Sequence, residues 1–261
     1  MKNTASAATC VRVVRLATVL ALMAVPAAVL TDRTAEARAE LSIAAPAATS
    51  AVVASATSTT ATATVAALDP AAWQDVAVGD IDARVFETAL KAAANAIERG
   101  DVTDPGTLTV IDFSQPSTKR RMWVYDLRAR TLLFDELVSH GRGSGLANAT
   151  EFSNVPESNR SSLGLYRTAE TYIGKHGYSL RIDGLEPGIN DRARERAIVI
   201  HAADYVNEKS ARAQGYLGRS LGCPALRPEV ARQVIDTVKG GGLIFAYYPD
   251  PHWLRTSKYL G

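Results

Sequence analysis

The sequence is poor in cysteine and histidine and carries almost no net charge. Its 261 residues include two cysteines and four histidines, and the formal net charge at pH 7 is +2. This balance, without a basic block interleaved with aromatic residues, gives no indication of nucleic-acid binding. The histidines are scattered and have no cysteine pair nearby, so the usual spacing of a zinc site is missing. We therefore expect neither a metal ion nor another cofactor.

Residues 1–37 have the pattern of a secretory signal peptide. Basic residues near the start are followed by an apolar run at residues 16–30, and residues 35–37 read Ala-Glu-Ala, an A-x-A cleavage site. The alternative is an uncleaved anchor. The apolar run is about 15 residues long, whereas a spanning helix needs about 20. We expect an exported protein in the periplasm or cell envelope.

Export would leave Cys223 as the only cysteine of the mature chain, because Cys10 precedes the apolar run. Thiols in an oxidising compartment usually pair, and a lone cysteine cannot form an intramolecular disulfide. Cys223 is therefore a candidate reactive thiol. The alternative is a small, buried apolar side chain, which is common for free cysteine.

The composition divides the rest of the chain into three parts. Residues 38–75 are rich in Ala, Thr and Ser and are predicted to be a flexible spacer. Residues 76–254 are long enough for one sizeable domain. Residues 255–261 are left as a C-terminal tail.

The domain is predicted to be mostly β, in the α+β class. One helix is expected from Asp80, a candidate N-cap, to just before Gly100, and another over residues 228–239. The first three strands are joined by short turns, which predicts an antiparallel meander with Trp123 and Tyr125 in the core. Strands are predicted at residues 107–113, 121–127, 131–139, 162–168, 178–182, 197–200 and 243–248.

A histidine at the end of a strand and a later cysteine turn form the candidate active site. The apolar run 197–200 ends at His201, and Cys223 follows 22 residues later. A free thiol has a pKa of about 8.5, and a nearby imidazole that accepts its proton makes it a useful nucleophile. The intervening residues can form a lobe that folds back and brings the two side chains together.

Pro224 constrains the chemistry of this turn. It has no N–H group, and it disfavours the α region for Cys223. An oxyanion hole built here must therefore use the backbone N–H groups of Leu221, Gly222 or Cys223. The alternative is that Gly222 and Pro224 form an ordinary tight turn.

Several further segments accompany this turn in a fixed order. They are FSQPS (113–117), HGR (140–142), FSN (152–154), SSLG (161–164), GKHGYSL (174–180), HAADY (201–205) and LGRS (217–220), followed by SLGC (220–223). The ordered set, over about residues 80–249, resembles the YkuD-type murein L,D-transpeptidase catalytic domain family.

The resemblance implies an L,D-transpeptidase-like β-sandwich or barrel with a few packed helices. It implies that Cys223 is the nucleophile, that His201 is the base, oriented by a backbone carbonyl, and that Ser220 helps to shape the pocket or to hold the donor. The substrate would be the tetrapeptide stem of peptidoglycan, as donor and as candidate acceptor. Attack on the carbonyl of the third residue would expel the terminal D-Ala, and the acyl group would pass to an amine or to water.

The sequence departs from this family in three ways. The interval between the histidine and the cysteine motif is longer than in the common form. Leu221 stands where better-known members often have histidine, and residues 224–225 are Pro-Ala where they carry an apolar residue and then Arg or Asn. Arg219 and Arg227 are candidates for the missing polar contact.

Other polar residues carry weaker predictions. His176 and Tyr178 lie in a glycine-flanked loop and either bind the donor or form a hydrogen-bonded structural pair. His140, in a long loop, is a minor candidate for substrate contact. His252 and the charged run at residues 191–196 are expected to be solvated. The alternative for the basic residues of the run is contact with anionic wall polymer.

Two alternative functions remain at this point. An L,D-carboxypeptidase would use the same acyl-enzyme and pass the acyl group to water. A non-catalytic wall-binding module would carry an inert thiol, and rapid thiol-selective labelling of the folded protein would distinguish it from an enzyme.

The first prediction concerns export. Cleavage after Ala37 should leave a mature N-terminus near Arg38, because the A-x-A site follows the apolar run. Intact-mass measurement of the protein from the cell envelope tests this. Retention of residues 1–37 would replace secretion with anchoring.

Overall fold

A computed structural model describes residues 66–261, and the structural statements below concern this part of the chain. The predicted signal peptide and most of the predicted spacer lie outside the described residues. Within residues 66–261, no helix has both the length and the apolar character needed to cross a membrane.

Eight strands form one mixed sheet in the order β3-β2-β1-β8-β4-β5-β6-β7. The first three strands pair antiparallel as the predicted meander, whereas β1–β8 and β6–β7 are parallel pairs. Trp123 and Tyr125 are fully buried, as predicted. The mostly β fold is therefore confirmed. The strands are β1 (Thr107–Asp112), β2 (Met122–Asp126), β3 (Thr131–Glu136), β4 (Gly164–Gly174), β5 (Gly177–Gly184), β6 (Val199–Ala202), β7 (Ala225–Leu226) and β8 (Leu243–Tyr247).

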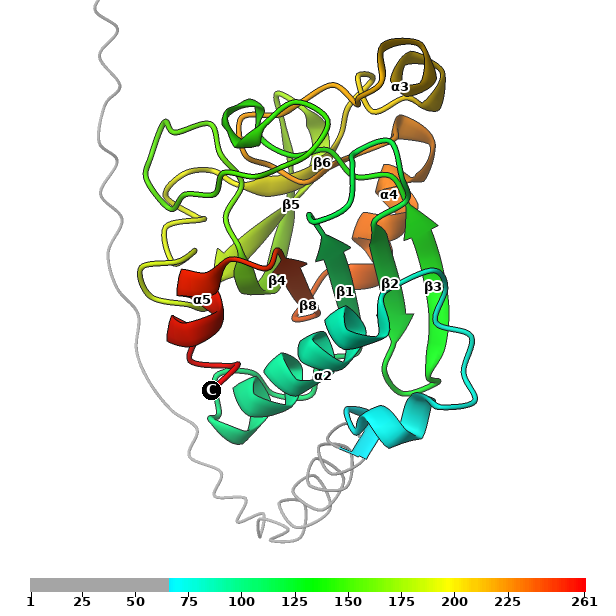
Figure 1. Cartoon of the computed structure of the whole chain (residues 1–261), viewed down its shortest axis with the longest axis vertical. Helices are drawn as coiled ribbons and strands as arrows, with labels where there is room; N and C mark the ends of the chain where they lie inside the picture. The colour runs from blue at the N-terminus through cyan, green and yellow to red at the C-terminus, as the bar shows by residue number, and fades with distance from the viewer. Residues whose placement is uncertain (1–65) are drawn as a thin grey trace, which may run out of the picture. The chain divides into compact units, whose positions relative to one another are not determined.

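Two longer helices cover the sheet. Figure 1 shows α2 (Ala83–Glu98) crossing in front of the strands, where it contacts β1 and β8, and α4 (Pro228–Val238) behind them, where it contacts β1, β5 and β6. The N-cap of α2 is Asp82, two residues later than predicted, and its carboxylate accepts hydrogen bonds from the first-turn N–H groups. Both helices bury one apolar stripe.

Two short helices were not predicted from the sequence. They are α3 (Glu208–Gln214), between His201 and the cysteine turn, and α5 (Pro251–Thr256). Each begins with a side-chain cap, from Asn207 and Asp250 respectively. Neither is long enough to show a clear apolar stripe, so hydrophobic periodicity could not reveal them.

The domain extends beyond both predicted boundaries. The short 3-10 helix η1 (Pro70–Trp73) belongs to it, because Trp73 is buried and packs edge-on against Phe86 with ring centroids 5.2 Å apart. Residues 255–261 are also packed, since Tyr259 is fully buried and its carbonyl accepts a hydrogen bond from a side chain of α2. The spacer therefore ends earlier than residue 75, and the tail is part of the fold.

The two edge strands approach each other and nearly close the sheet into a barrel. Glu136, the buried last residue of β3, forms a bidentate pair with Arg227, which follows β7, with its shortest N–O distances at 2.8 Å. The backbone N–H of Ser139 also donates to the carbonyl of Ala225 at 3.0 Å. The two edges of the sheet, β3 and β7, are therefore joined close to the cysteine turn.

The second prediction tests this closure. Arg227→Met leaves the Glu136 carboxylate buried without its main partner, which typically costs about 3–5 kcal/mol. Urea unfolding should show a loss of about 3 kcal/mol. The control is Arg212→Met, because Arg212 is 83% exposed and its pair with Glu208 contributes less than about 0.5 kcal/mol. Equal effects of the two substitutions would contradict a closing role for Arg227.

Candidate functional site

The predicted cysteine and histidine line the same pocket, which has a volume of about 260 Å³. The reason is the register of β6 and β7, whose parallel pairing sets His201 beside Ala225, two residues after Cys223. The segment that includes α3 forms the lobe between them. The pocket is also lined by Lys175, His176, Arg196, Arg219, Ser220 and Leu221.

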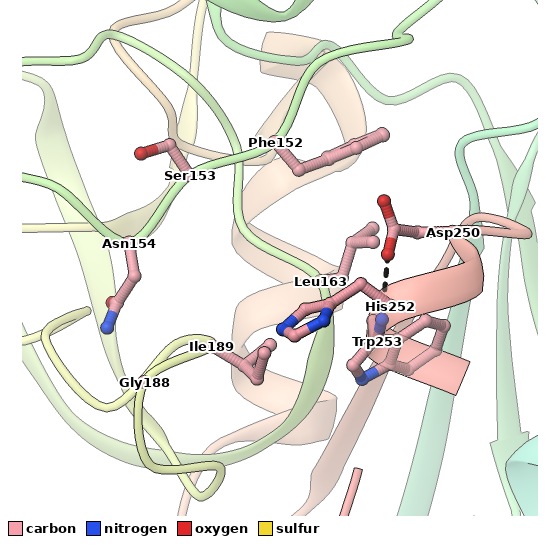
Figure 2. A pocket seen from close by; sticks show the side chains of 9 residues that line it. All are labelled: Phe152, Ser153, Asn154, Leu163, Gly188, Ile189, Asp250, His252 and Trp253. Carbon is pink, nitrogen blue, oxygen red and sulfur yellow. Dashed lines mark hydrogen bonds between the residues drawn. The ribbon is translucent and has the colours of Figure 1, made fainter. Parts of the chain in front are cut away.

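A second pocket of about 200 Å³ lies against α5 and contains no thiol. Figure 2 shows Asp250, His252 and Trp253 on one side of it and Ser153 and Asn154 on the other, with the Phe152 side chain across the top. The Asp250 carboxylate caps α5 and accepts a hydrogen bond from the backbone N–H of Trp253 at 2.7 Å. His252 is exposed, as expected. This pocket offers no nucleophile paired with a base, so the cysteine pocket is the candidate site.

The Cys223 thiol is buried and protonated at neutral pH. Its side chain belongs to a residue that is only 9% exposed, and Sγ donates a weak hydrogen bond to the Ala197 carbonyl at 3.8 Å. Burial raises the pKa of Cys223, and the Val199 backbone N–H and the cations Arg196 and Lys175 oppose this shift. Thiolate formation at this site therefore needs a base.

The His201 imidazole is held in the tautomer that a base requires. Nδ1 lies 2.8 Å from the carbonyl oxygen of Ala202, to which it donates, so Nε2 carries the lone pair. Burial lowers the pKa of His201, and the neighbouring His176 and Lys175 lower it further, against the opposing effect of the Ala202 carbonyl. The imidazole is therefore neutral at pH 7. Asp204 is exposed, and the orienting group is a backbone carbonyl, the type that the family resemblance implies.

His176 is brought to the site, where its ring stacks on that of His201. The ring centroids are 4.3 Å apart and the planes meet at 25°. Burial and the adjacent Lys175 lower the pKa of His176, so the stacked ring is neutral too. Tyr178 is not brought to the pocket. Its hydroxyl donates to Asp236 on α4 at 2.7 Å, which makes it a structural contact in this fold.

Ser220 closes the cysteine turn on itself. Its hydroxyl donates to the Cys223 carbonyl at 2.6 Å and accepts from the Gly222 N–H at 3.0 Å. Gly222 was predicted as an oxyanion donor, but its N–H is therefore already used. Within residues 66–261, the backbone N–H groups of Leu221 and Cys223 donate no hydrogen bond, so these two remain candidates for the predicted oxyanion hole.

His140 contacts the cysteine turn through its backbone but does not line the pocket. It is fully buried, and Nδ1 accepts a hydrogen bond from the Arg121 guanidinium at 2.8 Å. Burial, and then the Arg121 charge, lower the pKa of His140 to about 4. Its backbone carbonyl accepts a hydrogen bond from the Ser220 N–H at 2.9 Å. His140 is thus a neutral structural residue next to the site.

The two arginines proposed from the sequence behave differently. Arg219 lines the pocket, and Nη1 donates to the Gly145 carbonyl at 2.9 Å. Arg227 is committed to Glu136 and does not line the pocket, so it cannot supply the missing polar contact.

Sequence reasoning missed Arg196, which it placed in the solvated charged run. Arg192 and Arg194 of that run are exposed, but Arg196 is half-buried, lines the pocket, and donates to the carbonyl of Ser153 at 2.7 Å. Its position directly before the strand that carries His201 is the signal that could have identified it. Among residues 66–261, no three His, Cys, Asp or Glu side chains are grouped so that they could hold a metal ion.

The third prediction concerns the backbone of the turn. Gly222 has φ of +127°, and an added Cβ would lie 2.8 Å from the Arg160 carbonyl oxygen. Gly222→Ala combines left-handed strain of about 1–2 kcal/mol with overpacking of about 1–3 kcal/mol, so we expect a loss of about 3 kcal/mol and altered Cys223 alkylation. Gly215, with φ of +81° and no atom within 4 Å of an added Cβ, is the matched control.

Gly215→Ala should cost only the strain, about 1 kcal/mol, and leave alkylation unchanged. Urea unfolding and the alkylation rate measure both variants. If Gly222→Ala behaves like Gly215→Ala, close packing of the turn does not shape the site.

Comparison with solved structures finds L,D-transpeptidases at low similarity. An L,D-transpeptidase from Mycobacterium smegmatis is 17% identical with a TM-score of 0.34, covering 55% of this chain and 59% of that one. One from Mycobacterium tuberculosis H37Rv is 17% identical with a TM-score of 0.37, covering 56% and 59%. One from Stackebrandtia nassauensis is 14% identical with a TM-score of 0.34, covering 72% and 91%. These similarities are too low to carry an argument, and no curated protein matches the chain.

The family comparison is decisive. The family model described as the L,D-transpeptidase catalytic domain matches residues 78–247, which is more than half of the chain and includes both His201 and Cys223. The chain therefore belongs to the family of L,D-transpeptidase catalytic domains.

Proposed function

We propose that this protein is an exported cysteine acyltransferase that acts on the stem peptides of peptidoglycan. The observation that carries the proposal is the shared pocket of Cys223 and His201, in which the imidazole keeps Nε2 available as a proton acceptor. Family membership supports peptidoglycan as the general substrate.

The first half of the reaction would form a thioester on Cys223. The thiol leaves the Ala197 carbonyl and turns toward the donor, His201 Nε2 takes its proton, and Sγ bonds to the carbonyl carbon of the third stem residue. The oxyanion is stabilised by the N–H groups of Leu221 and Cys223. Collapse of the intermediate breaks the amide bond, and His201 returns the proton to the departing amine of D-Ala.

The second half would transfer the acyl group. An acceptor amine attacks the thioester carbonyl, and His201 takes the amine proton. The C–S bond then breaks, and Cys223 recovers its proton from His201. Water in place of the amine would give carboxypeptidase activity by the same path, so the products distinguish the two reactions.

The charge of the pocket fits an acidic peptide. Lys175, Arg196 and Arg219 line it, whereas none of its lining residues is Asp or Glu. A stem peptide ends in a free carboxylate, and such a group is favoured by nearby cations. This supports a donor that brings its terminal carboxylate into the pocket.

The resting pair is neutral, which has a consequence for pH dependence. Burial raises the pKa of the thiol and lowers that of the imidazole, and both shifts favour the neutral pair over a thiolate–imidazolium pair. Protonation of His201 removes the base, and its lowered pKa moves this loss to a pH below the usual value of 6.5. Activity should therefore persist below pH 6.5.

Export is part of the same proposal. Its support is the signal-peptide pattern of residues 1–37 together with a wall substrate that lies outside the cytoplasm. The expected location is the periplasm or cell envelope.

The fourth prediction tests the thiol–imidazole pair with purified muropeptides. Cys223→Ala should abolish the release of D-Ala, and His201→Ala should slow it by about 10²–10⁴-fold because general-base help is lost. Asp204→Asn is the control and should have little effect, since Asp204 is exposed and Nδ1 of His201 is bound to Ala202. Mass spectrometry measures the released D-Ala and the products.

Unchanged release of D-Ala by Cys223→Ala would rule out the cysteine mechanism. The pH profile of Cys223 alkylation provides a second readout for the base. If His201→Ala is alkylated at the same rate and with the same profile as the parent, His201 is not the base, and its stacking partner His176 becomes the next candidate.

A further inference from the structure

Arg196 occupies an unusual position for an arginine in a charged surface segment. The residue after it, Ala197, has a φ of +54°, a left-handed conformation that is uncommon outside glycine. The chain therefore bends sharply between Arg196 and strand β6. The carbonyl of Ala197 accepts the thiol hydrogen bond from Cys223, so this bend is in direct contact with the candidate nucleophile.

The guanidinium of Arg196 is fixed by several neutral acceptors. Nη1 donates to the Ser153 carbonyl at 2.7 Å and to the Ser162 hydroxyl at 2.5 Å. Nη2 donates to the Arg160 carbonyl at 2.5 Å and approaches the Ser158 hydroxyl at 3.4 Å. Among residues 66–261, no carboxylate forms an ion pair with it. Its positive charge is therefore held in place and left without a counter-ion.

The same guanidinium lies against the cysteine turn. A Cβ placed on Gly222 would be 3.3 Å from Nη2 of Arg196 and 2.8 Å from the Arg160 carbonyl oxygen. Arg196 and Cys223 also line the same pocket. A fixed guanidinium next to a buried sulfur is well placed to stabilise negative charge that develops there, because a half-buried site is screened less than the surface.

We propose that Arg196 is a positioning residue that stabilises the Cys223 thiolate with its charge and holds the wall of residues 153–162 against the cysteine turn. This inference rests on the proposed role of Cys223 as the nucleophile. Electrostatics support it, since the Arg196 charge opposes the rise in the pKa of Cys223 that burial causes. In return, the Cys223 charge opposes the lowering of the pKa of Arg196 by burial.

Other charged or titratable groups also face the pocket, but they are placed differently. Lys175 is exposed, so solvent screens its charge, and Arg219 donates to the carbonyl of Gly145. The remaining titratable side chains that line the pocket beside Cys223 are those of Tyr172, His176, His201 and Tyr205. Arg219 is half-buried and held by a backbone carbonyl as Arg196 is, but the Arg196 charge, and not that of Arg219, is among those that lower the pKa of Cys223, and Nη2 of Arg196 lies against Gly222.

The fifth prediction is a shift in the titration of the thiol. Arg196→Gln retains an amide that can donate to the loop carbonyls but removes the charge, so the pKa of Cys223 should rise by about one unit. Arg196→Lys keeps the charge and should shift the pKa much less. Arg192→Gln is the matched control, because Arg192 belongs to the same segment but is exposed and paired with Glu195, and it should leave the pKa unchanged.

The pH dependence of Cys223 alkylation in the full-length mature protein measures these shifts, and thermal unfolding shows that each variant is folded. An unchanged profile in Arg196→Gln would overturn the charge role. An equal shift in the pKa of Cys223 in Arg196→Gln and Arg196→Lys would contradict the charge role. The effect would then come only from the hydrogen bonds that Arg196 donates to residues 153–162. If Arg196→Gln does not fold, Arg196→Lys still decides, because a shift of one unit with the charge retained contradicts the proposal.

Alkylation needs no turnover, so this result is separable from the proposed function. Release of D-Ala by Cys223→Ala would remove the cysteine mechanism whatever the titration shows. If Arg196→Gln has the same pH profile of Cys223 alkylation as the parent protein, Arg196 does not have the proposed role, and the cysteine mechanism is unaffected.

Discussion

The parallel register between β6 and β7 is the constraint on which the site depends. It sets His201 beside Ala225, the first residue of β7. Cys223 lies two residues before Ala225 in the sequence, so the register brings His201 close to the cysteine turn. β7 has only two residues, and a pair this short contributes little stability alone. Its position is secured from the other edge of the sheet, where Ser139 donates to Ala225 and Glu136 binds Arg227. Closure of the sheet therefore sets the relative position of His201 and Cys223, the proposed catalytic pair.

The long segment between β3 and β4 holds the cysteine turn from its other side. The His140 carbonyl receives the Ser220 N–H, and the Ser161 hydroxyl donates to the Gly222 carbonyl at 3.1 Å. Arg196 connects the same segment to the chain that enters β6. The turn thus has little freedom to relax, and this fixes the Cys223 side chain in the pocket that it shares with His201.

Much of this arrangement could be predicted from the sequence because it has strong local signals. The meander of β1, β2 and β3 follows from alternating apolar runs and short turns, and His201 and Cys223 stand out by residue type and by the motifs around them. Local signals could not specify contacts made over long distances in the chain. Arg227 and Arg196 look alike as surface cations in the sequence, yet tertiary packing sends one to Glu136 and the other to the cysteine turn. The use of the Gly222 N–H by Ser220 and the stacking of His176 on His201 likewise depend on folded geometry.

The central claim is that Cys223 carries the acyl group during turnover. The most direct measurement is intact-mass analysis of mature protein mixed with a disaccharide-tetrapeptide donor and quenched in acid, followed by peptide mapping. The account predicts a mass increase equal to the donor without its terminal D-Ala, located on Cys223 and increased when acceptor amine is withheld. Release of D-Ala with the adduct on another residue would contradict it.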